Sequence, residues 1–241
     1  MLEIKNLTKI YPGNVKAVNN LSLTVENGDL YGFIGHNGAG KTTTIKAVVG
    51  IHSFEEGVIL INGLSIKSHP VECKKSMAYI PDSPDLYEFM SGNRYLNFVS
   101  NMYDLPMAQR KERIEKYSKA FEIEQVLSSS ISSYSHGMKQ KVALIAALIH
   151  EPKLLVLDEP FVGLDPKAAY TLKEYFHQMT AEGCSIFFST HGLEVAQKLC
   201  NKIAIIKNGK LIESGKTEDV VGNKSLEDVF LELTEGVSGN E

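Results

Sequence analysis

The stretch "LYGFIGHNGAGKTTTIKAVVG", residues 30–50, decides the fold of this chain. It opens with an apolar run of the length of a buried strand, which leads directly into a glycine-rich loop. The segment from residue 41 onward predicts a short helix that ends at Gly50, because glycine commonly terminates helices. A strand, a glycine loop and a helix in direct succession are typical of α/β proteins.

The loop satisfies the pattern G-x-x-x-x-G-K-[ST] with Gly35, Gly40, Lys41 and Thr42. In this context backbone N–H groups bind phosphate oxygens, Lys41 neutralises the β- and γ-phosphates, and the Thr42 hydroxyl is a ligand for Mg²⁺. The predicted nucleotide-binding residues are Gly35, His36, Asn37, Gly38, Ala39, Gly40, Lys41, Thr42 and Thr43. A chance glycine-rich turn, the plain alternative, does not require a strand before it and a helix after it.

A second acidic segment, "LLVLDEP" at residues 154–160, predicts a buried strand that ends in two carboxylates. Asp158 is the predicted Mg²⁺ ligand, since phosphate-loop NTPases hold the metal with such a strand-end carboxylate. Glu159 follows where the strand ends, and its carboxylate can polarise the water that attacks the γ-phosphate. Two solvated acids at a strand end are the alternative, and the glycine loop upstream favours the catalytic interpretation.

Apolar strand-like runs alternate with helical segments along most of the chain and predict a largely parallel sheet covered on both faces. Residues 1–83 and 152–241 are assigned to this α/β core, within a single domain. Residues from about 84 to 151 change to helical periodicity and are predicted to form an inserted helical subdomain. A polar tail follows the last predicted helix, which ends near Thr234.

The composition argues against several classes of protein. The chain has 241 residues with 25 Lys and Arg against 29 Asp and Glu, a net charge of −4, so no nucleic-acid partner is expected. The apolar run "VALIAALI" is far shorter than the roughly 20 residues of a membrane span, and the N-terminus lacks a signal-peptide core. Cys73, Cys184 and Cys200 are widely spaced and are predicted to be reduced thiols of a cytoplasmic protein.

The stretch "SSYSHGMKQKVALIAALI", residues 132–149, predicts a second anion site. A polar loop holding Ser135 and Gly137 opens directly into an apolar helix, and helix N-termini bind anions. The phosphate loop, however, lies far upstream at residues 35–43. The residues alone therefore do not tell which phosphate this loop binds.

Five motifs occur in the order "GHNGAGKTT", "YSHGMKQK", "LLVLDEP", "GLDP" and "STH". Together they resemble the ATPase subunit of ATP-binding cassette (ABC) transporters, from Met1 to about Thr234. The resemblance implies a phosphate-loop NTPase core with a mostly parallel sheet, an antiparallel β subdomain and an inserted helical subdomain. It also implies that Ser135 and Gly137 belong to the signature loop, which binds the γ-phosphate of ATP held by a second ATPase cassette.

Three more site residues are implied by the same resemblance. Tyr11 matches the aromatic residue that stacks on adenine, and its alternative is a surface aromatic beside a turn. Asp165 matches the loop that links the two sites across the dimer, and its alternative is an acid at the start of a helix beginning at Pro166. His191 matches the histidine that contacts the γ-phosphate and the attacking water.

Two residues depart from the usual pattern of the family. His136 stands where the signature normally has glycine, and a protonated imidazole there would strengthen the contact with the partner's γ-phosphate. A side chain turned to solvent is the alternative. Asp82 stands where glutamine is common, in the segment that couples the metal to the membrane subunits. Its carboxylate can attract Mg²⁺ but, when ionised, cannot donate a hydrogen bond as an amide does.

The expected function is therefore ATP binding and hydrolysis, with ATP and Mg²⁺, in a transporter most similar to ABC-2-type exporters. The expected partners are membrane-spanning permease subunits and a second ATPase cassette, identical or different, at the cytoplasmic face of the membrane. A non-transport ABC ATPase acting on ribosomes or nucleic acid is the main alternative. A GTPase is disfavoured because "NKIA" has Ala204 where guanine recognition needs aspartate. A cassette that binds ATP without hydrolysing it is disfavoured by Lys41, Asp158, Glu159 and His191.

Overall fold

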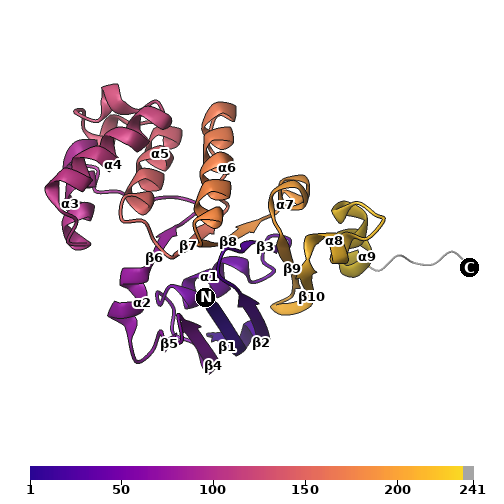
Figure 1. Cartoon of the computed structure of the whole chain (residues 1–241). Coiled ribbons are helices and arrows are strands. Elements are labelled where there is room, and N and C mark those ends of the chain that lie inside the picture. Colours follow the sequence, from indigo (N-terminus) through magenta and orange to yellow (C-terminus); the bar gives the residue numbers. More distant parts are fainter. Residues whose placement is uncertain (236–241) are drawn as a thin grey trace, which may run out of the picture.

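Two sheets and a group of helices make up the described residues 1–235 of this computed structural model (Figure 1). The end of the predicted polar tail, residues 236–241, lies outside the described residues. The larger sheet has six strands in the order β10-β9-β3-β8-β7-β6. These are β3 (Leu30–Ile34), β6 (Met77–Ile80), β7 (Leu154–Asp158), β8 (Ser185–Thr190), β9 (Lys202–Lys207) and β10 (Lys210–Lys216). Neighbouring strands are parallel except for β9 and β10, which form a hairpin.

The smaller sheet is antiparallel and packs against one face of the larger one. Its strand order is β2-β1-β4-β5, with β1 (Leu2–Tyr11), β2 (Val15–Val25), β4 (Glu56–Ile61) and β5 (Leu64–Ser65). Helix α1 (Lys41–Val48) shares the buried core between the two sheets through Ile45. This core also takes Val156 from β7 and Phe187 from β8. The arrangement confirms the predicted α/β fold class.

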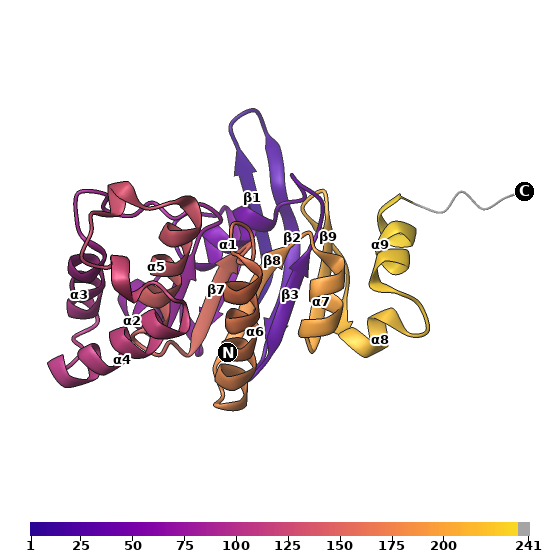
Figure 2. The ribbon, with the colours of Figure 1, turned by 90° about the horizontal axis from the view of Figure 1, so that it is seen from above.

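Alternate residues of the same strands form a second core on the opposite face. Leu155, Leu157 and Phe188 pack there against helices, because successive side chains of a strand point to opposite faces of the sheet. Besides α1, the α-helices that precede β9 are α2 (Pro70–Ser76), α3 (Gly92–Met102), α4 (Met107–Ala120), α5 (His136–Leu148), α6 (Pro166–Ala181) and α7 (Leu193–Leu199). Figures 1 and 2 show α3, α4 and α5 together at one end of the molecule, beyond the edge strand β6.

The C-terminal helices lie at the other end of the sheet (Figures 1 and 2). They are α8 (Thr217–Val221) and α9 (Leu226–Glu235). The backbone N–H of Leu226 donates to the amide oxygen of Gln197 at 2.9 Å and so ties the start of α9 to α7. The Phe230 ring is only 4% exposed and meets the imidazole of His36 edge-on, with 4.7 Å between ring centroids. Helix α9 therefore contacts the phosphate loop directly.

We expect Phe230→Ala to lower the free energy of unfolding by about 3 kcal/mol, because truncating a buried phenylalanine leaves a cavity. Guanidinium denaturation followed by circular dichroism measures the loss. Leu231→Ala is the matched control, since this neighbour on the same helix is 39% exposed and should change stability by less than about 0.5 kcal/mol. Equal losses for the two variants would show that α9 is not anchored through Phe230.

Candidate nucleotide-binding and catalytic site

Three parallel strands bring the predicted catalytic segments to one edge of the larger sheet. Strand β3 leads into the phosphate loop, β7 ends at Asp158, and β8 ends one residue before His191. The strands are adjacent, so that Ile34 lies level with Thr190 and Asp158 with Ser189. Segments more than 100 residues apart in the sequence therefore meet at the carboxyl ends of the strands, where open α/β sheets bind their ligands.

The phosphate loop depends on glycine at two positions where other backbone comes close. Gly40 has a φ of 109°, and a Cβ added there would lie 2.5 Å from the carbonyl oxygen of Ala17. A Cβ on Gly35 would lie 2.6 Å from the carbonyl oxygen of Ile206. Both are backbone carbonyls, which cannot move aside as the end of a flexible side chain could. Both positions therefore require glycine on steric grounds, in addition to the role of the loop in binding phosphate.

Lys41, the first residue of α1, is held over the loop. Its side chain is buried, and its ammonium group donates to the carbonyl oxygens of Gly35 at 2.6 Å and His36 at 3.3 Å. The same ammonium lies 3.7 Å from Oε1 of Glu159. This geometry places a positive charge between the loop and the predicted catalytic carboxylate, where phosphate groups of a nucleotide would be neutralised.

Glu159 occupies the centre of the predicted catalytic group. Its Oε1 faces Lys41, and its Oε2 lies 3.0 Å from Nδ1 of His191. Its backbone has a φ of 50°, a left-handed conformation that is uncommon for residues other than glycine. The carboxylate is mostly buried, whereas the His191 side chain is 63% exposed. The structure thus brings together Lys41, Glu159 and His191, as the catalytic prediction requires.

Asp158 is 1% exposed and uses its two carboxylate oxygens differently. Oδ1 accepts a hydrogen bond from the Ser189 hydroxyl, whereas Oδ2 is buried without a hydrogen bond among residues 1–235. A buried oxygen without a partner fits a metal ligand. The described residues contain no cluster of three or more His, Cys, Asp or Glu that could hold a metal ion. Mg²⁺ is usually bound in proteins through one or two carboxylates together with substrate phosphates.

The other two predicted metal ligands, Thr42 and Asp82, are both exposed. Thr42 lies in the first turn of α1, next to Lys41. Asp82 follows β6 and makes no ion pair among the described residues. Burial raises the pKa of Tyr79 on β6, and the carboxylates of Asp158 and Asp82 raise it further. Both carboxylates therefore act on the same buried hydroxyl, and a metal role for Asp82 stays a prediction.

Tyr11 lies beside the phosphate loop. It is the last residue of β1, and its hydroxyl is 3.5 Å from the Thr43 hydroxyl on α1. The ring of His52 meets it edge-on, with 6.0 Å between ring centroids. A half-buried aromatic ring next to the loop could stack on a nucleotide base, as predicted.

The predicted signature loop contacts a different part of its own chain. Ser135 caps α5 by accepting a hydrogen bond from the Met138 N–H at 3.3 Å, and it is exposed, as is His136. The imidazole of His136 lies directly over Gly163, where an added Cβ would be 2.5 Å from its Cδ2. A Cβ on Gly137 would in turn lie 2.9 Å from the Gly163 carbonyl oxygen. We expected His136 either to contact phosphate or to point to solvent. The structure shows an exposed side chain that also packs on Gly163.

Asp165 links α5, the helix that follows the predicted signature loop, to α6. Its Oδ1 caps α6 by accepting from the Ala168 N–H at 2.8 Å, and its Oδ2 pairs with the Lys141 ammonium at 2.7 Å. The hydrogen bond to Lys141, followed by that to Ala168, lowers the pKa of Asp165 below its ordinary value. The helix-capping alternative describes this geometry, and a role of Asp165 across a dimer stays a prediction.

Two residues of the site were missed by the sequence analysis. Ser189 contacts both predicted strand-end acids, and Lys141 pairs with Asp165. Each lay within a quoted motif, "STH" and "YSHGMKQK", but was not singled out. Their partners are 24 or more residues away in the sequence, so the motif alone did not identify the contacts.

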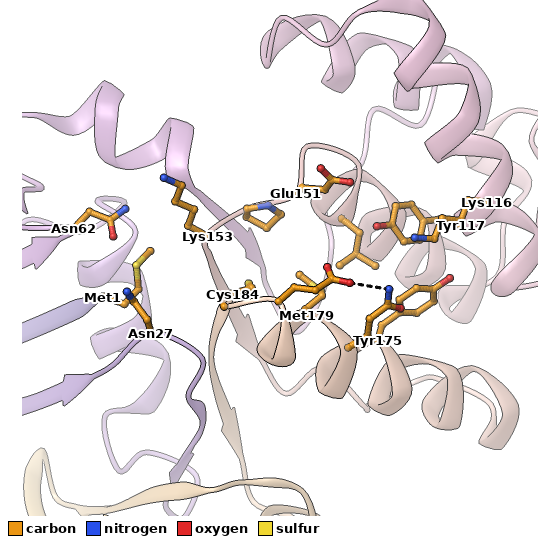
Figure 3. A pocket seen from close by; sticks show the side chains of 15 residues that line it. Met1, Asn27, Asn62, Lys116, Tyr117, Glu151, Lys153, Tyr175, Met179 and Cys184 are labelled. Carbon is orange, nitrogen blue, oxygen red and sulfur yellow. Dashed lines mark hydrogen bonds between the residues drawn. The ribbon is translucent and has the colours of Figure 1, made fainter.

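A cavity of about 620 Å³ lies away from this site (Figure 3). Asn27, Lys153 and Cys184 line it, and each precedes a strand of the larger sheet. It therefore lies at the amino ends of the strands, opposite the phosphate loop. Tyr117 and Tyr175 from the helices form its other wall. None of the predicted site residues lines it.

Comparison with known proteins agrees with the geometry. The sequence profile described as "ABC transporter" matches residues 18–162. The chain belongs to the ABC transporter family. The ABC-type transporter ATP-binding protein EcsA of Bacillus subtilis (strain 168) is 34% identical over 246 residues, covering 100% of this chain and 99% of that protein.

Two further relatives show the same family. The SkfA peptide export ATP-binding protein SkfE of Bacillus subtilis (strain 168) is 34% identical, with 88% of both chains covered. A solved structure of the ATP binding subunit of an ABC transporter is 35% identical, with a TM-score of 0.92 over 97% of this chain and 99% of that one. This ABC chain is thus of the ATP-binding subunit type, as its motifs predicted.

We expect Gly40→Ala to weaken ATP binding at least tenfold, because the added methyl group would collide with the Ala17 carbonyl and displace the loop. Calorimetric titration of the purified protein with ATP measures this change. Gly183→Ala is the matched control: Gly183 has a similar φ of 91°, but a Cβ there meets no atom within 4 Å. Both variants carry left-handed strain of about 1–2 kcal/mol. If Gly40→Ala and Gly183→Ala both bind ATP more weakly, the cause is general destabilisation and not the contact with Ala17.

Proposed function

We propose that this chain hydrolyses ATP to drive export across a membrane, as one of two ATPase cassettes bound to membrane-spanning permease subunits. The observation that carries the proposal is the position of the Glu159 carboxylate between Lys41 and His191, next to the buried Asp158. All four groups lie at the strand ends that hold the phosphate loop. They supply the charge and the base that phosphoryl transfer to water requires.

In the proposed reaction, Glu159 accepts a proton from the water whose oxygen attacks the γ-phosphorus of ATP. The bond from that phosphorus to the β-phosphate oxygen breaks, and ADP and phosphate are the products. Lys41 and the backbone N–H groups of the loop offset negative charge on the phosphates as it redistributes. His191 holds Oε2 of Glu159 in place through Nδ1. Bound Mg²⁺, for which Asp158 and Thr42 are the proposed ligands and Asp82 a further one, would supply additional neutralisation of phosphate charge.

A second cassette is proposed because this chain holds two phosphate-binding elements that do not meet. No hydrogen bond among the described residues joins Ser135, His136 or Gly137 to the phosphate loop. The exposed N-terminus of α5 is suited to an anion outside its own chain. We therefore propose that Ser135 and Gly137 bind the γ-phosphate of ATP held by the partner cassette, with Asp165 close to the contact and Tyr11 stacked on the adenine of its own chain.

The proposed permease contact is an exposed aromatic patch, defined as Tyr87, Phe89 and Phe98. Phe89 is 77% exposed, and the ring of Tyr87 lies within 6 Å of the rings of both other residues. Exposed aromatic clusters are typical of protein interfaces. The resemblance to the family implies that this region receives the membrane subunits. The proposed location is the cytoplasmic face of the membrane, through the permease subunits. Among residues 1–235, none of the helices has the length and apolarity to cross a bilayer.

Export is the proposed direction because the motifs resemble those of exporter subunits and because the relative SkfE is named for peptide export. The alternative of a non-transport ABC ATPase acting on ribosomes or nucleic acid receives no support from the charge of the chain, which is −4.

Glu159→Gln should lower the rate of ATP hydrolysis by about 1,000-fold, because the amide cannot accept the proton from water. ATP affinity should change little, since the phosphate loop is intact. A phosphate-release assay and a calorimetric titration separate the two effects. Glu194→Gln, which replaces an exposed acid of α7, is the matched control and should hydrolyse ATP at the parent rate. A Glu159→Gln protein that retains full turnover would contradict the role of this base.

The Glu159→Gln protein should also form a stable dimer with ATP, because blocked hydrolysis keeps two cassettes closed around the nucleotide. Light scattering after size exclusion, with and without ATP, measures the mass. Adding Ser135→Arg should abolish the dimer, since the longer side chain fills the space of the partner's phosphate. A protein that binds ATP but stays monomeric would instead favour a different cassette as the partner.

A further inference from the structure

Ser189, a buried residue of β8, contacts both acids of the proposed ATPase site. It is 0% exposed and is the register partner of Asp158 on the neighbouring strand β7. Its hydroxyl donates to Oδ1 of Asp158. Its Oγ also accepts a hydrogen bond from the Glu159 N–H at 3.1 Å, and that N–H reaches the Ser189 carbonyl oxygen at 3.2 Å as well. One side chain thus contacts the proposed metal ligand and the backbone of the proposed base.

The chemistry of the groups determines which atom donates. An ionised carboxylate can only accept hydrogen bonds, and a backbone N–H can only donate. The serine hydroxyl has one proton and two lone pairs, so the proton goes to Asp158 and a lone pair takes the Glu159 N–H. All donors and acceptors of the arrangement are satisfied in this way except Oδ2 of Asp158, which has no hydrogen bond among the described residues. Ser189 occupies one oxygen and leaves the other available.

We propose that Ser189 is a positioning residue for Mg²⁺-dependent ATP hydrolysis, an inference that rests on the proposed ATPase function. By holding Oδ1, it sets the rotation of the Asp158 carboxylate, so that Oδ2 is the oxygen presented to the metal. Partners of this kind orient metal-binding carboxylates in many sites. Neighbouring strands in parallel register make the contact rigid, because both residues lie on buried backbone.

The second contact of Ser189 supports the conformation of Glu159. That residue adopts a left-handed φ of 50°, which is unfavourable for a side chain with a Cβ. Its N–H is held by two oxygens of Ser189 at this point. This backbone conformation directs the Glu159 carboxylate toward Lys41 and His191. Ser189 therefore couples the position of the metal ligand to that of the base, and both should be disturbed when its hydroxyl is removed.

The test compares three variants in the full chain. Ser189→Ala removes the hydroxyl, and Ser189→Cys replaces it by a weak donor of similar size without leaving a cavity. Ser185→Ala is the matched control: Ser185 is on the same strand, is 0% exposed, and donates its hydroxyl to the Glu26 carbonyl oxygen at 2.8 Å, outside the site. Calorimetry measures ATP affinity in excess MgCl₂ and in EDTA, and a phosphate-release assay measures the Mg²⁺ concentration for half-maximal turnover.

We expect both Ser189 variants to need about 10-fold more Mg²⁺ for half-maximal turnover and to lose Mg²⁺-dependent enhancement of ATP binding, as is usual when a partner of a metal ligand is removed. Affinity for ATP in EDTA should stay within about twofold of the parent, since no hydrogen bond among the described residues joins Ser189 to the phosphate loop. Ser185→Ala should match the parent in every measurement.

Mg²⁺ titrations of Ser189→Ala and Ser189→Cys that superimpose on that of the parent would overturn the inference while leaving the ATPase proposal intact. If Ser189→Ala fails to fold, Ser189→Cys carries the comparison alone. A parent protein that neither binds nor hydrolyses ATP would instead overturn the proposed function itself.

Discussion

Parallel pairing of β3, β8 and β7 is the constraint on which the rest of the site depends. The three strands are fully buried and aligned in register, so their carboxyl ends reach the same edge of the sheet. The phosphate loop, the Asp158–Glu159 pair and His191 follow directly from those ends. A shift of one residue between β7 and β8 would turn Asp158 to the opposite face and separate it from Ser189. The apolar cores on both faces of the sheet oppose such a shift.

Electrostatic balance at this edge depends on few groups. Lys41 is buried and is held by loop carbonyls, with the Glu159 carboxylate as its nearest opposite charge. A buried ammonium is unfavourable without partners, and these contacts supply them and hold the side chain in place. Glu159 in turn occupies a strained backbone position that surrounding hydrogen bonds maintain. Strain of this kind is common at functional sites, where it directs a side chain to its reaction partner.

A second set of contacts joins the signature loop to the segment that follows Glu159. The Lys141–Asp165 ion pair and the packing of His136 on Gly163 both connect α5 to the loop before α6. These contacts join the predicted signature loop to a loop that begins next to Glu159. The C-terminal helix adds a further contact at the opposite side, through Phe230 against His36. Tyr11 near one end of the chain and Phe230 near the other thus both contact the phosphate-binding segment.

The sequence by itself determined the α/β class and the family, and it predicted the residues of the phosphate loop together with Asp158 and Glu159. These features are readable because their chemistry needs neighbouring residues: glycines at fixed spacing, a lysine after them, or two acids at a strand end. Only the tertiary structure decided which partners these residues have. Ser189 meets Asp158 across 31 positions, Phe230 meets His36 from the last helix, and His136 lies over Gly163. Such contacts depend on strand register, helix docking and side-chain rotation, which arise from packing of the whole chain and leave no periodic signal in the sequence.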